Sequence, residues 1–180
     1  MSVLLSAGTA MVAARKFLLI LAFVVMPAQA SSVTTASYKT EARSDITVSN
    51  EAIVREAFES WASGRGSVFD LLSPDILWTI HGSGPIARTY NGIEDFMHNA
   101  SLPLVSRLAS PLKPELHHIW AEGDRVVIRF DASATTTSGA LYRNQFVWIF
   151  RMEGGSVVEA EAFLDLVAYQ HVVDNNPRLK

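Results

Sequence analysis

Residues 115–170 read ELHHIWAEGDRVVIRFDASATTTSGALYRNQFVWIFRMEGGSVVEAEAFLDLVAYQ, and this stretch decides the fold. It holds three glycine-bearing turn signals, at Gly123-Asp124, Ser138-Gly139 and Gly154-Gly155, between segments rich in β-branched and aromatic residues. Short turns of this kind join antiparallel strands that are neighbours in a sheet. The stretch therefore predicts four consecutive antiparallel strands.

If each turn is a two-residue loop, the numbering gives the residues that face each other across it. Arg129 would then face Trp148 on one neighbouring strand and His118 on the other. Cross-strand partners share a face of the sheet, and so do residues two apart on one strand. On this register one face carries His118, Trp120, Arg129, Asp131, Tyr142, Asn144, Phe146, Trp148, Glu161, Phe163 and Asp165. Aromatic side chains mixed with ionisable ones are typical of a pocket lining, but a one-residue slip would move a whole strand to the other face.

The first thirty residues are typical of a secretory signal peptide. Arg15 and Lys16 precede an unbroken apolar run over residues 17–26, and Ala28-Gln29-Ala30 has the small-x-small pattern of a cleavage site. The run is too short for an ordinary transmembrane helix, with an uncleaved membrane anchor as the alternative. We expect residues 1–30 to be removed, leaving a periplasmic or secreted protein with no stable membrane insertion.

Composition argues against several classes of function. The chain has a formal net charge of −3 and no cysteine. It therefore has no electrostatic reason to bind nucleic acid and no disulfide to hold it together outside the cell. His117 and His118 are adjacent, so on a regular strand they should point to opposite faces and not share a metal ion. With no phosphate-binding glycine motif either, we expect neither a metal nor an organic cofactor.

The chain before the strands is mainly helical in pattern. Residues 31–47 are rich in Ser, Thr and Ala without periodicity, which predicts a flexible linker. Ser49 is expected to cap a helix that ends near Ser63. The pattern then predicts a short helix at 67–72, a strand at 76–81, a helix at 92–100 and a polar tail at 174–180. This order indicates one α+β domain over residues 48–173, with a curved antiparallel sheet wrapped around the N-terminal helices.

Residues 49–172 resemble the nuclear transport factor 2-like superfamily, in particular its SnoaL-like branch. The matching segments are AFESWASGRGSVFDLL (57–72), ILWTIHGSGPIARTYNGIEDF (76–96), WAEGDRVVIRF (120–130) and FRMEGGSVVEAEAFLD (150–165). The resemblance implies a cone-shaped, cystatin-like barrel with an interior pocket. Its members include polyketide cyclases, ketosteroid isomerase, scytalone dehydratase and limonene epoxide hydrolase, as well as binding modules, so the fold alone does not name an activity.

Two site motifs carry over from the resemblance. Asp165 matches the aspartate that ends the final strand motif, a frequent acid–base position in cyclase-like members. Arg129 and Asp131 match the Arg-x-Asp pair of the epoxide hydrolase. That enzyme orients its water with a Tyr-x-Asn on the first strand, where this chain has Trp78-Thr79-Ile80, which argues against epoxide hydrolysis.

The residues themselves leave the role of this trio open. Asp165 sits late in a largely apolar strand that includes Leu166 and Val167. A buried carboxyl there could serve as a general acid or base; alternatively it accepts hydrogen bonds from Asn144 or a helix end. Arg129 and Asp131 could set the charge state of Asp165, or form a structural ion pair. The catalytic hypothesis predicts an isomerase, cyclase, dehydratase or hydrolase acting on a small, mostly apolar, oxygenated molecule.

A second hypothesis is a non-catalytic module that binds a small hydrophobic molecule. Both hypotheses predict the same substrate-binding residues, namely Trp78, His118, Tyr142, Asn144, Phe146, Trp148 and Phe163. A homodimer is also predicted, because the register places an apolar patch on the outer face of the sheet, formed by Val126, Ile128, Phe130, Val147 and Ile149.

Overall fold

The computed structural model describes residues 30–179, with side chains from residue 38 onward. The predicted signal peptide lies outside these residues, apart from its last position. In chain order the elements are α1 (Ala30–Ala62), η1 (Val68–Leu71), β1 (Leu72–Ile80), β2 (Thr89–Asn91), α2 (Ile93–Phe96), η2 (Met97–Ser101), α3 (Leu102–Val105), β3 (Lys113–Glu122), β4 (Arg125–Thr135), β5 (Leu141–Glu153), β6 (Ser156–Leu164) and α4 (Leu166–Asn175).

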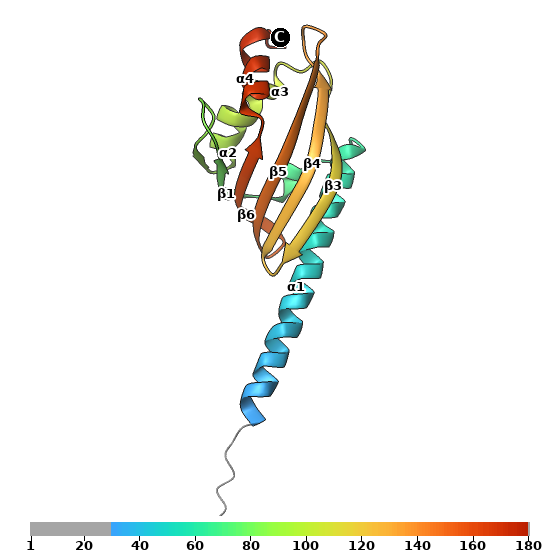
Figure 1. Cartoon of the computed structure of the whole chain (residues 1–180), viewed down its shortest axis with the longest axis vertical. Coiled ribbons are helices and arrows are strands. Elements are labelled where there is room, and N and C mark those ends of the chain that lie inside the picture. Colours follow the sequence, from blue (N-terminus) through green and yellow to red (C-terminus); the bar gives the residue numbers. More distant parts are fainter. Residues whose placement is uncertain (1–29, 180) are drawn as a thin grey trace, which may run out of the picture.

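The strands form one open, curved sheet in the order β2-β1-β6-β5-β4-β3. Strands β3 to β6 are the four antiparallel neighbours that the turn signals predicted. Strand β1 joins the sheet parallel to β6, so one pairing departs from the antiparallel expectation. Helices lie against this sheet, with α1 beside β3 and the α2–η2–α3 segment and α4 toward the other edge (Figure 1). The α+β fold is confirmed.

The hairpin between β4 and β5 has a longer turn than expected. Thr136 and Ala140 close the loop through a backbone hydrogen bond of 2.8 Å, which leaves three residues between them. Gly139 has φ +85°, the left-handed conformation that three-residue hairpin loops require. Phe130 therefore pairs with Phe146, and Arg129 pairs with Val147 instead of Trp148. This one-residue slip places Arg129 and Asp131 on the opposite face from Phe146 and Trp148.

The hairpin between β5 and β6 begins as predicted and then shifts. Gly154 and Gly155 form the two-residue turn, with Glu153 paired to Ser156. A bulge between Arg151 and Met152 then changes the register, so that Trp148 pairs with Ala162 instead of Glu161. Phe163 and Glu161 consequently point away from the core.

Strand β3 keeps the predicted pairing of His118 with Arg129, but it contains a bulge between Leu116 and His118. The extra residue, His117, approaches Asp131 on the outer face, while His118 stacks on exposed Trp120 on that same face. The expectation that His117 and His118 point to opposite faces is wrong, because a bulge breaks the alternation of side chains.

Helix α1 extends far upstream of the expected start at Ser49. It begins at Ala30 and runs through residues 31–47, which contain no glycine or proline to end a helix. Its N-terminal half projects beyond the sheet (Figure 1). Thr47 and Asn50 bond the backbone of Gly123 in the β3–β4 turn, which fixes the helix to the sheet. Within residues 30–179, no helix is both long enough and apolar enough to span a membrane.

The C-terminal part of the predicted last strand is a helix. Strand β6 ends at Leu164, and α4 begins at Leu166 with Asp165 as its N-cap. The apolar residues Leu166 and Val167 therefore belong to a helix and not to the strand as expected. Farther upstream, Ser67 and Asp70 form a reciprocal capping box around η1, in agreement with the predicted short helix.

The core lies between α1 and the inner face of the sheet. Phe58 of α1 contacts Phe130 and Trp148, with ring centroids 5.0 and 6.1 Å apart. Phe130 in turn stacks on Phe146 at 4.7 Å. Edge-to-face and offset contacts of this kind add to the gain from burying the rings. Phe130, Phe146 and Trp148 also line an interior cavity.

Candidate functional site

A cavity of about 330 Å³ lies between the α2–η2–α3 segment and the inner face of the sheet. Eighteen of its lining residues are aromatic, aliphatic or thioether, and Ser101 completes the lining. They are Trp61, Phe69, Trp78, Ile80, Ile86, Phe96, Met97, Ala100, Leu104, Val105, Pro111, Leu112, Phe130, Phe146, Trp148, Ala162, Leu164 and Tyr169. Met97, Val105 and Pro111 are exposed, which indicates that the cavity reaches the surface beside η2 and α3.

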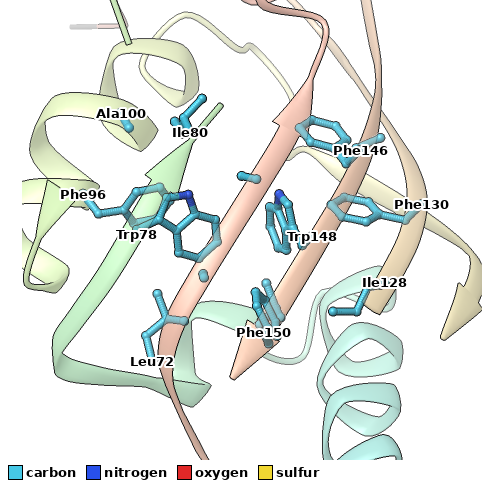
Figure 2. Packing of buried hydrophobic residues seen from close by; sticks show 14 of the residues in the cluster. Leu72, Trp78, Ile80, Phe96, Ala100, Ile128, Phe130, Phe146, Trp148 and Phe150 are labelled. Carbon is cyan, nitrogen blue, oxygen red and sulfur yellow. The ribbon is translucent and has the colours of Figure 1, made fainter. Parts of the chain in front are cut away.

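Two tryptophans, Trp78 and Trp148, contact each other in the wall of the cavity. Trp78 of β1 stacks on Phe96 of α2, with ring centroids 4.0 Å apart and an interplanar angle of 20°. Trp148 of β5 meets Trp78 edge to face at 5.1 Å. Figure 2 shows these rings with Phe130 and Phe146 along the sheet and Phe96 on the helical side. The surface is therefore built from flat π-faces and suits a flat apolar molecule.

The polar groups of the cavity are few. Among the described residues, no lining side chain is a carboxylate, an ammonium, a guanidinium or an imidazole. The Tyr169 hydroxyl donates a 2.7 Å hydrogen bond to the carbonyl oxygen of Ala100, and burial raises the pKa of this phenol. Trp78 Nε1 is buried and has no acceptor within the described residues. The cavity can therefore bind a neutral molecule, and it offers no group for proton transfer near neutral pH.

Three of the predicted substrate-binding residues, Trp78, Phe146 and Trp148, line this cavity. Tyr142 and Asn144 are buried on the same face but lie outside its lining. Asn144 Nδ2 donates to the Tyr142 hydroxyl at 2.9 Å, and burial raises the pKa of Tyr142 to about 12.

Phe163 and His118 lie on the outer face, contrary to the predicted register. Phe163 is 42% exposed and stacks on His81 with ring centroids 4.6 Å apart. The expectation that the two residues share the inner face with Phe146 and Trp148 is therefore wrong. The bulge between Arg151 and Met152 and the longer turn around Gly139 explain why.

Asp165 is exposed at the N-terminus of α4. Its Oδ1 accepts hydrogen bonds from the amides of Val167 at 2.9 Å and Ala168 at 3.0 Å. The backbone of Asp165, and not its carboxylate, is bound by Asn144. The burial on which the acid–base hypothesis relied is therefore wrong, while the helix-end contact named as its alternative is present.

Arg129 and Asp131 form an ion pair on the outer face of β4. The hydrogen bond from Arg129 lowers the pKa of Asp131, and His117 Nε2 lies 3.5 Å from the same carboxylate. Asp131 is thus held as an anion.

The three predicted catalytic residues nevertheless border one feature. A hollow of about 650 Å³ on the outer side of the sheet is lined by Arg129, Asp131, Arg143 and Asp165, with Phe163 and the neighbouring strand residues. The hollow and the interior cavity have different linings, except for Phe146 and Leu164, which border both.

Sequence reasoning missed most of the helical side of the cavity. Phe69, Phe96, Ala100, Leu104 and Tyr169 come from η1, α2, η2, α3 and α4. Periodicity within residues 92–100 could have identified Phe96 and Ala100 as one face of a helix. Tyr169 gave no usable signal, because α4 was expected to continue a strand.

The predicted dimer patch does not lie on the surface. Val126, Ile128 and Phe130 of the predicted dimer patch are fully buried in the core, so that patch is wrong. The homodimer itself stays a prediction. Within the part of the chain that the structure describes, no group of three or more His, Asp or Glu residues is placed to hold a metal ion.

Comparison with known proteins identifies the family. A model described as SnoaL-like domain matches residues 54–160, more than half of the chain. A search of curated proteins found no match.

Several solved structures share the fold. A proposed SnoaL-like polyketide cyclase from Jannaschia sp. CCS1 is 22% identical, with a TM-score of 0.57 over 73% of this chain and 96% of that one. AclR, a proposed hydroxylase from Streptomyces galilaeus, is 21% identical, with a TM-score of 0.56 over 73% and 99%. An NTF2-like protein from Burkholderia thailandensis E264 is 20% identical, with a TM-score of 0.55 over 68% and 95%. The chain therefore belongs to the SnoaL-like domain family.

Proposed function

We propose that this protein binds a small, mostly apolar molecule in the interior cavity. The observation that carries this proposal is an aromatic-walled space with no charged lining side chain among the described residues. Its volume of about 330 Å³ is roughly twice that of the ~150 Å³ apolar cavity that holds benzene in another protein. A molecule of two or three fused rings matches this size.

The expected affinity follows from the area that such a ligand buries. About 250 Å² of apolar surface at ~25 cal/mol/Å² corresponds to roughly 6 kcal/mol before the cost of association. Dissociation constants of roughly tens of micromolar or weaker are therefore expected for a simple hydrocarbon.

Fluorene is a suitable probe, because Trp61, Trp78 and Trp148 line the cavity and their fluorescence should report its entry. Ala162 is 2% exposed, lines the cavity and lies in the sheet between Ile80 and Trp148. Ala162→Leu should therefore fill the space and weaken fluorene binding at least tenfold. Ala140→Leu makes the same chemical change at an exposed position and should bind like the wild type. Equal affinity of both variants, or no saturable signal with the wild type, would contradict interior binding.

A second candidate is acid–base catalysis, of the isomerase or cyclase kind, at the outer hollow. The specific observation in its favour is that Arg129, Asp131 and Asp165 border this single hollow. Asp165 would transfer the proton. The Arg129–Asp131 pair borders the same hollow, where its charges would act on the bound substrate. Export from the cell also stays a prediction.

An enolisation assay tests this second candidate directly. Exchange of the α-protons of 2-tetralone in D₂O, followed by NMR, detects a general base that acts on ketones. If Asp165 is that base, Asp165→Asn should slow exchange by about 100-fold or more. Asn is also a good N-cap residue, so the variant should keep α4 intact. Equal rates for the wild type and the folded variant would exclude this role for Asp165.

A further inference from the structure

An exposed apolar surface lies at the mouth of the interior cavity. Met97 and Val105 line the cavity, yet they are 37% and 45% exposed, so they form its rim. Leu102 of the same helical segment is 45% exposed, and Leu179 of the C-terminal tail is 57% exposed. The Leu179 amide donates a 2.6 Å hydrogen bond to the carbonyl oxygen of Ser106, which holds the tail against the end of α3. Met97, Leu102, Val105 and Leu179 together form what we call the rim surface.

A π turn aligns the helical part of the rim surface. At the end of η2 the amide of Leu102 donates to the carbonyl oxygen of Met97, an i→i+5 bond. In a regular α-helix, residues five apart point about 140° away from each other. The wider turn instead places Leu102 one turn along the axis from Met97, and Val105 follows Leu102 by three residues on the same side. Single π turns are frequent at functional sites, and this one brings three apolar side chains together beside the cavity.

The chain around the rim surface carries positive charge without negative charge. Residues 97–114 and 175–180 contain no Asp or Glu, although the whole chain has a net charge of −3. Their Lys and Arg residues are Arg107, Lys113, Arg178 and Lys180. Within the described residues, the charged groups of Lys113 and Arg178 have no hydrogen-bond or ion-pair partner. The guanidinium of Arg107 bonds only to backbone carbonyl oxygens, so no described carboxylate neutralises it.

We propose that the rim surface docks on a lipid bilayer that contains anionic lipids. Exposed apolar patches with a polar border mark interaction sites, and basic residues beside them favour an anionic membrane. The apolar side chains would enter the boundary between headgroups and acyl chains, while Lys113 and Arg178 contact the anionic headgroups. Figure 1 shows α3 and the C-terminus at one end of the molecule and the projecting part of α1 at the other, so α1 does not obstruct this contact.

Docking would give the interior cavity a direct source of ligand. The rim residues Met97 and Val105 border both the cavity and the proposed membrane contact. An apolar molecule could then pass from the bilayer to the cavity without crossing water. This transfer rests on the interior binding proposed above, whereas docking itself does not.

A fluorescent label at a single residue tests the docking. The chain contains no cysteine, so Leu102→Cys in the whole chain can be labelled at one position with an environment-sensitive nitrobenzoxadiazole dye. Glu153→Cys provides the control, because the β5–β6 turn lies at the opposite end of the sheet (Figure 1). With vesicles of equal parts phosphatidylcholine and phosphatidylglycerol, the emission at residue 102 should shift to shorter wavelength, and that at residue 153 should not. The signal is local, so attachment of the chain through apolar residues 17–26 would not imitate it.

Charge variants in the labelled Leu102→Cys background test the role of the cations. Lys113→Gln and Arg178→Gln should each weaken binding to the mixed vesicles about fivefold, the effect of one cation near an anionic surface. Lys39→Gln removes one charge from the exposed, projecting part of α1 and should bind like its parent. Vesicles of phosphatidylcholine alone should bind more weakly than the mixed vesicles.

Several results would overturn the proposal. An unchanged emission at residue 102, equal shifts at residues 102 and 153, or equal binding of both kinds of vesicle would each do so. A shift that appears without vesicles as the protein concentration rises would assign the rim surface to a second copy of the chain instead. Fluorene binding is measured without vesicles, so failure of docking leaves interior binding standing, and failure of fluorene binding leaves docking standing.

Discussion

The side-chain amide of Asn144 binds both backbone polar groups of Asp165. Nδ2 donates to the Asp165 carbonyl oxygen and Oδ1 accepts from the Asp165 amide, each at 2.9 Å. Asn144 is 3% exposed and lies on β5, whereas Asp165 is the residue between β6 and α4. The amide thus replaces a strand partner at the point where β6 ends, and it fixes where α4 begins.

Replacing Asn144 should therefore destabilise the fold. In Asn144→Leu the Asp165 amide and carbonyl would lose their partner, and leaving such groups buried costs about 1–3 kcal/mol each. We expect the free energy of unfolding to fall by roughly 2–4 kcal/mol in urea denaturation. Gln145→Leu, at the exposed neighbouring position, should change it by less than about 0.5 kcal/mol. A loss below 1 kcal/mol in Asn144→Leu would show that this contact is not needed.

The carboxylate of Asp165 has a separate, smaller role in stability. It caps α4 through the amides of Val167 and Ala168. Asp165→Ala should lower the free energy of unfolding by about 1 kcal/mol, whereas Asp165→Asn should stay within a few tenths of the wild type. Thermal and urea denaturation of the two variants would measure the difference. Equal stability of Ala and Asn at this position would contradict the capping role.

These contacts also show how far the sequence could predict the fold. Hydrophobic patterning and glycine turns correctly predicted the meander, because both depend on local chemistry. The face of each strand depends on single-residue details. The extra loop residue around Gly139 and the bulge between Arg151 and Met152 were not visible as patterns, and each reversed the faces of one pairing.

The site was predictable to the same limited extent. Phe146 and Trp148 were identified because residues two apart on a strand share a face, and Trp78 because a large aromatic on a strand suits an apolar lining. The helical wall was not, since the placement of Phe96 and Tyr169 depends on how helices dock on the sheet. Asp165 was expected to be buried because a run of apolar residues continues past it, yet that run changes from strand to helix at this residue.

The Arg129–Asp131 pair predicts a specific acid sensitivity. The hydrogen bond from Arg129 lowers the pKa of Asp131 below its ordinary value of 3.8. Because the pKa of the folded state lies below that of the unfolded state, the ionised carboxylate stabilises the fold. This contribution is fully present above the unfolded value and is lost as the pH falls from there through the folded value.

The difference in unfolding free energy between the wild type and Asp131→Asn should therefore be constant above about pH 5 and shrink below about pH 4. Its size should not exceed about 1 kcal/mol, because both side chains are partly exposed. The same comparison in an Arg129→Gln background should show a smaller pH dependence, since the donor is gone. A difference that stays constant to about pH 3, or one unaffected by Arg129→Gln, would contradict the assignment.

Helix α1 makes two kinds of contact with the β3–β4 turn. Arg43 pairs with Glu122 at 2.7 Å, but both side chains are largely exposed. Deeper along the helix, Thr47 Oγ1 accepts from the Gly123 amide at 2.7 Å and Asn50 Nδ2 donates to the Gly123 carbonyl at 3.0 Å. Exposed ion pairs contribute about 0–1 kcal/mol, whereas buried backbone groups left unpaired cost more.

Truncation should separate these two contributions. A chain that begins at Asp45 loses Arg43 and keeps the contacts of Thr47 and Asn50, so its free energy of unfolding should lie within about 1 kcal/mol of that of a chain beginning at residue 31. A chain that begins at Glu51 also leaves the polar groups of Gly123 without these partners. Its free energy of unfolding should fall by about a further 2–4 kcal/mol. Urea denaturation of the three chains gives both differences. A large loss already at the Asp45 start would mean that the upstream part of α1 belongs to the folded domain, whereas no loss at the Glu51 start would mean that the turn holds its shape without the helix.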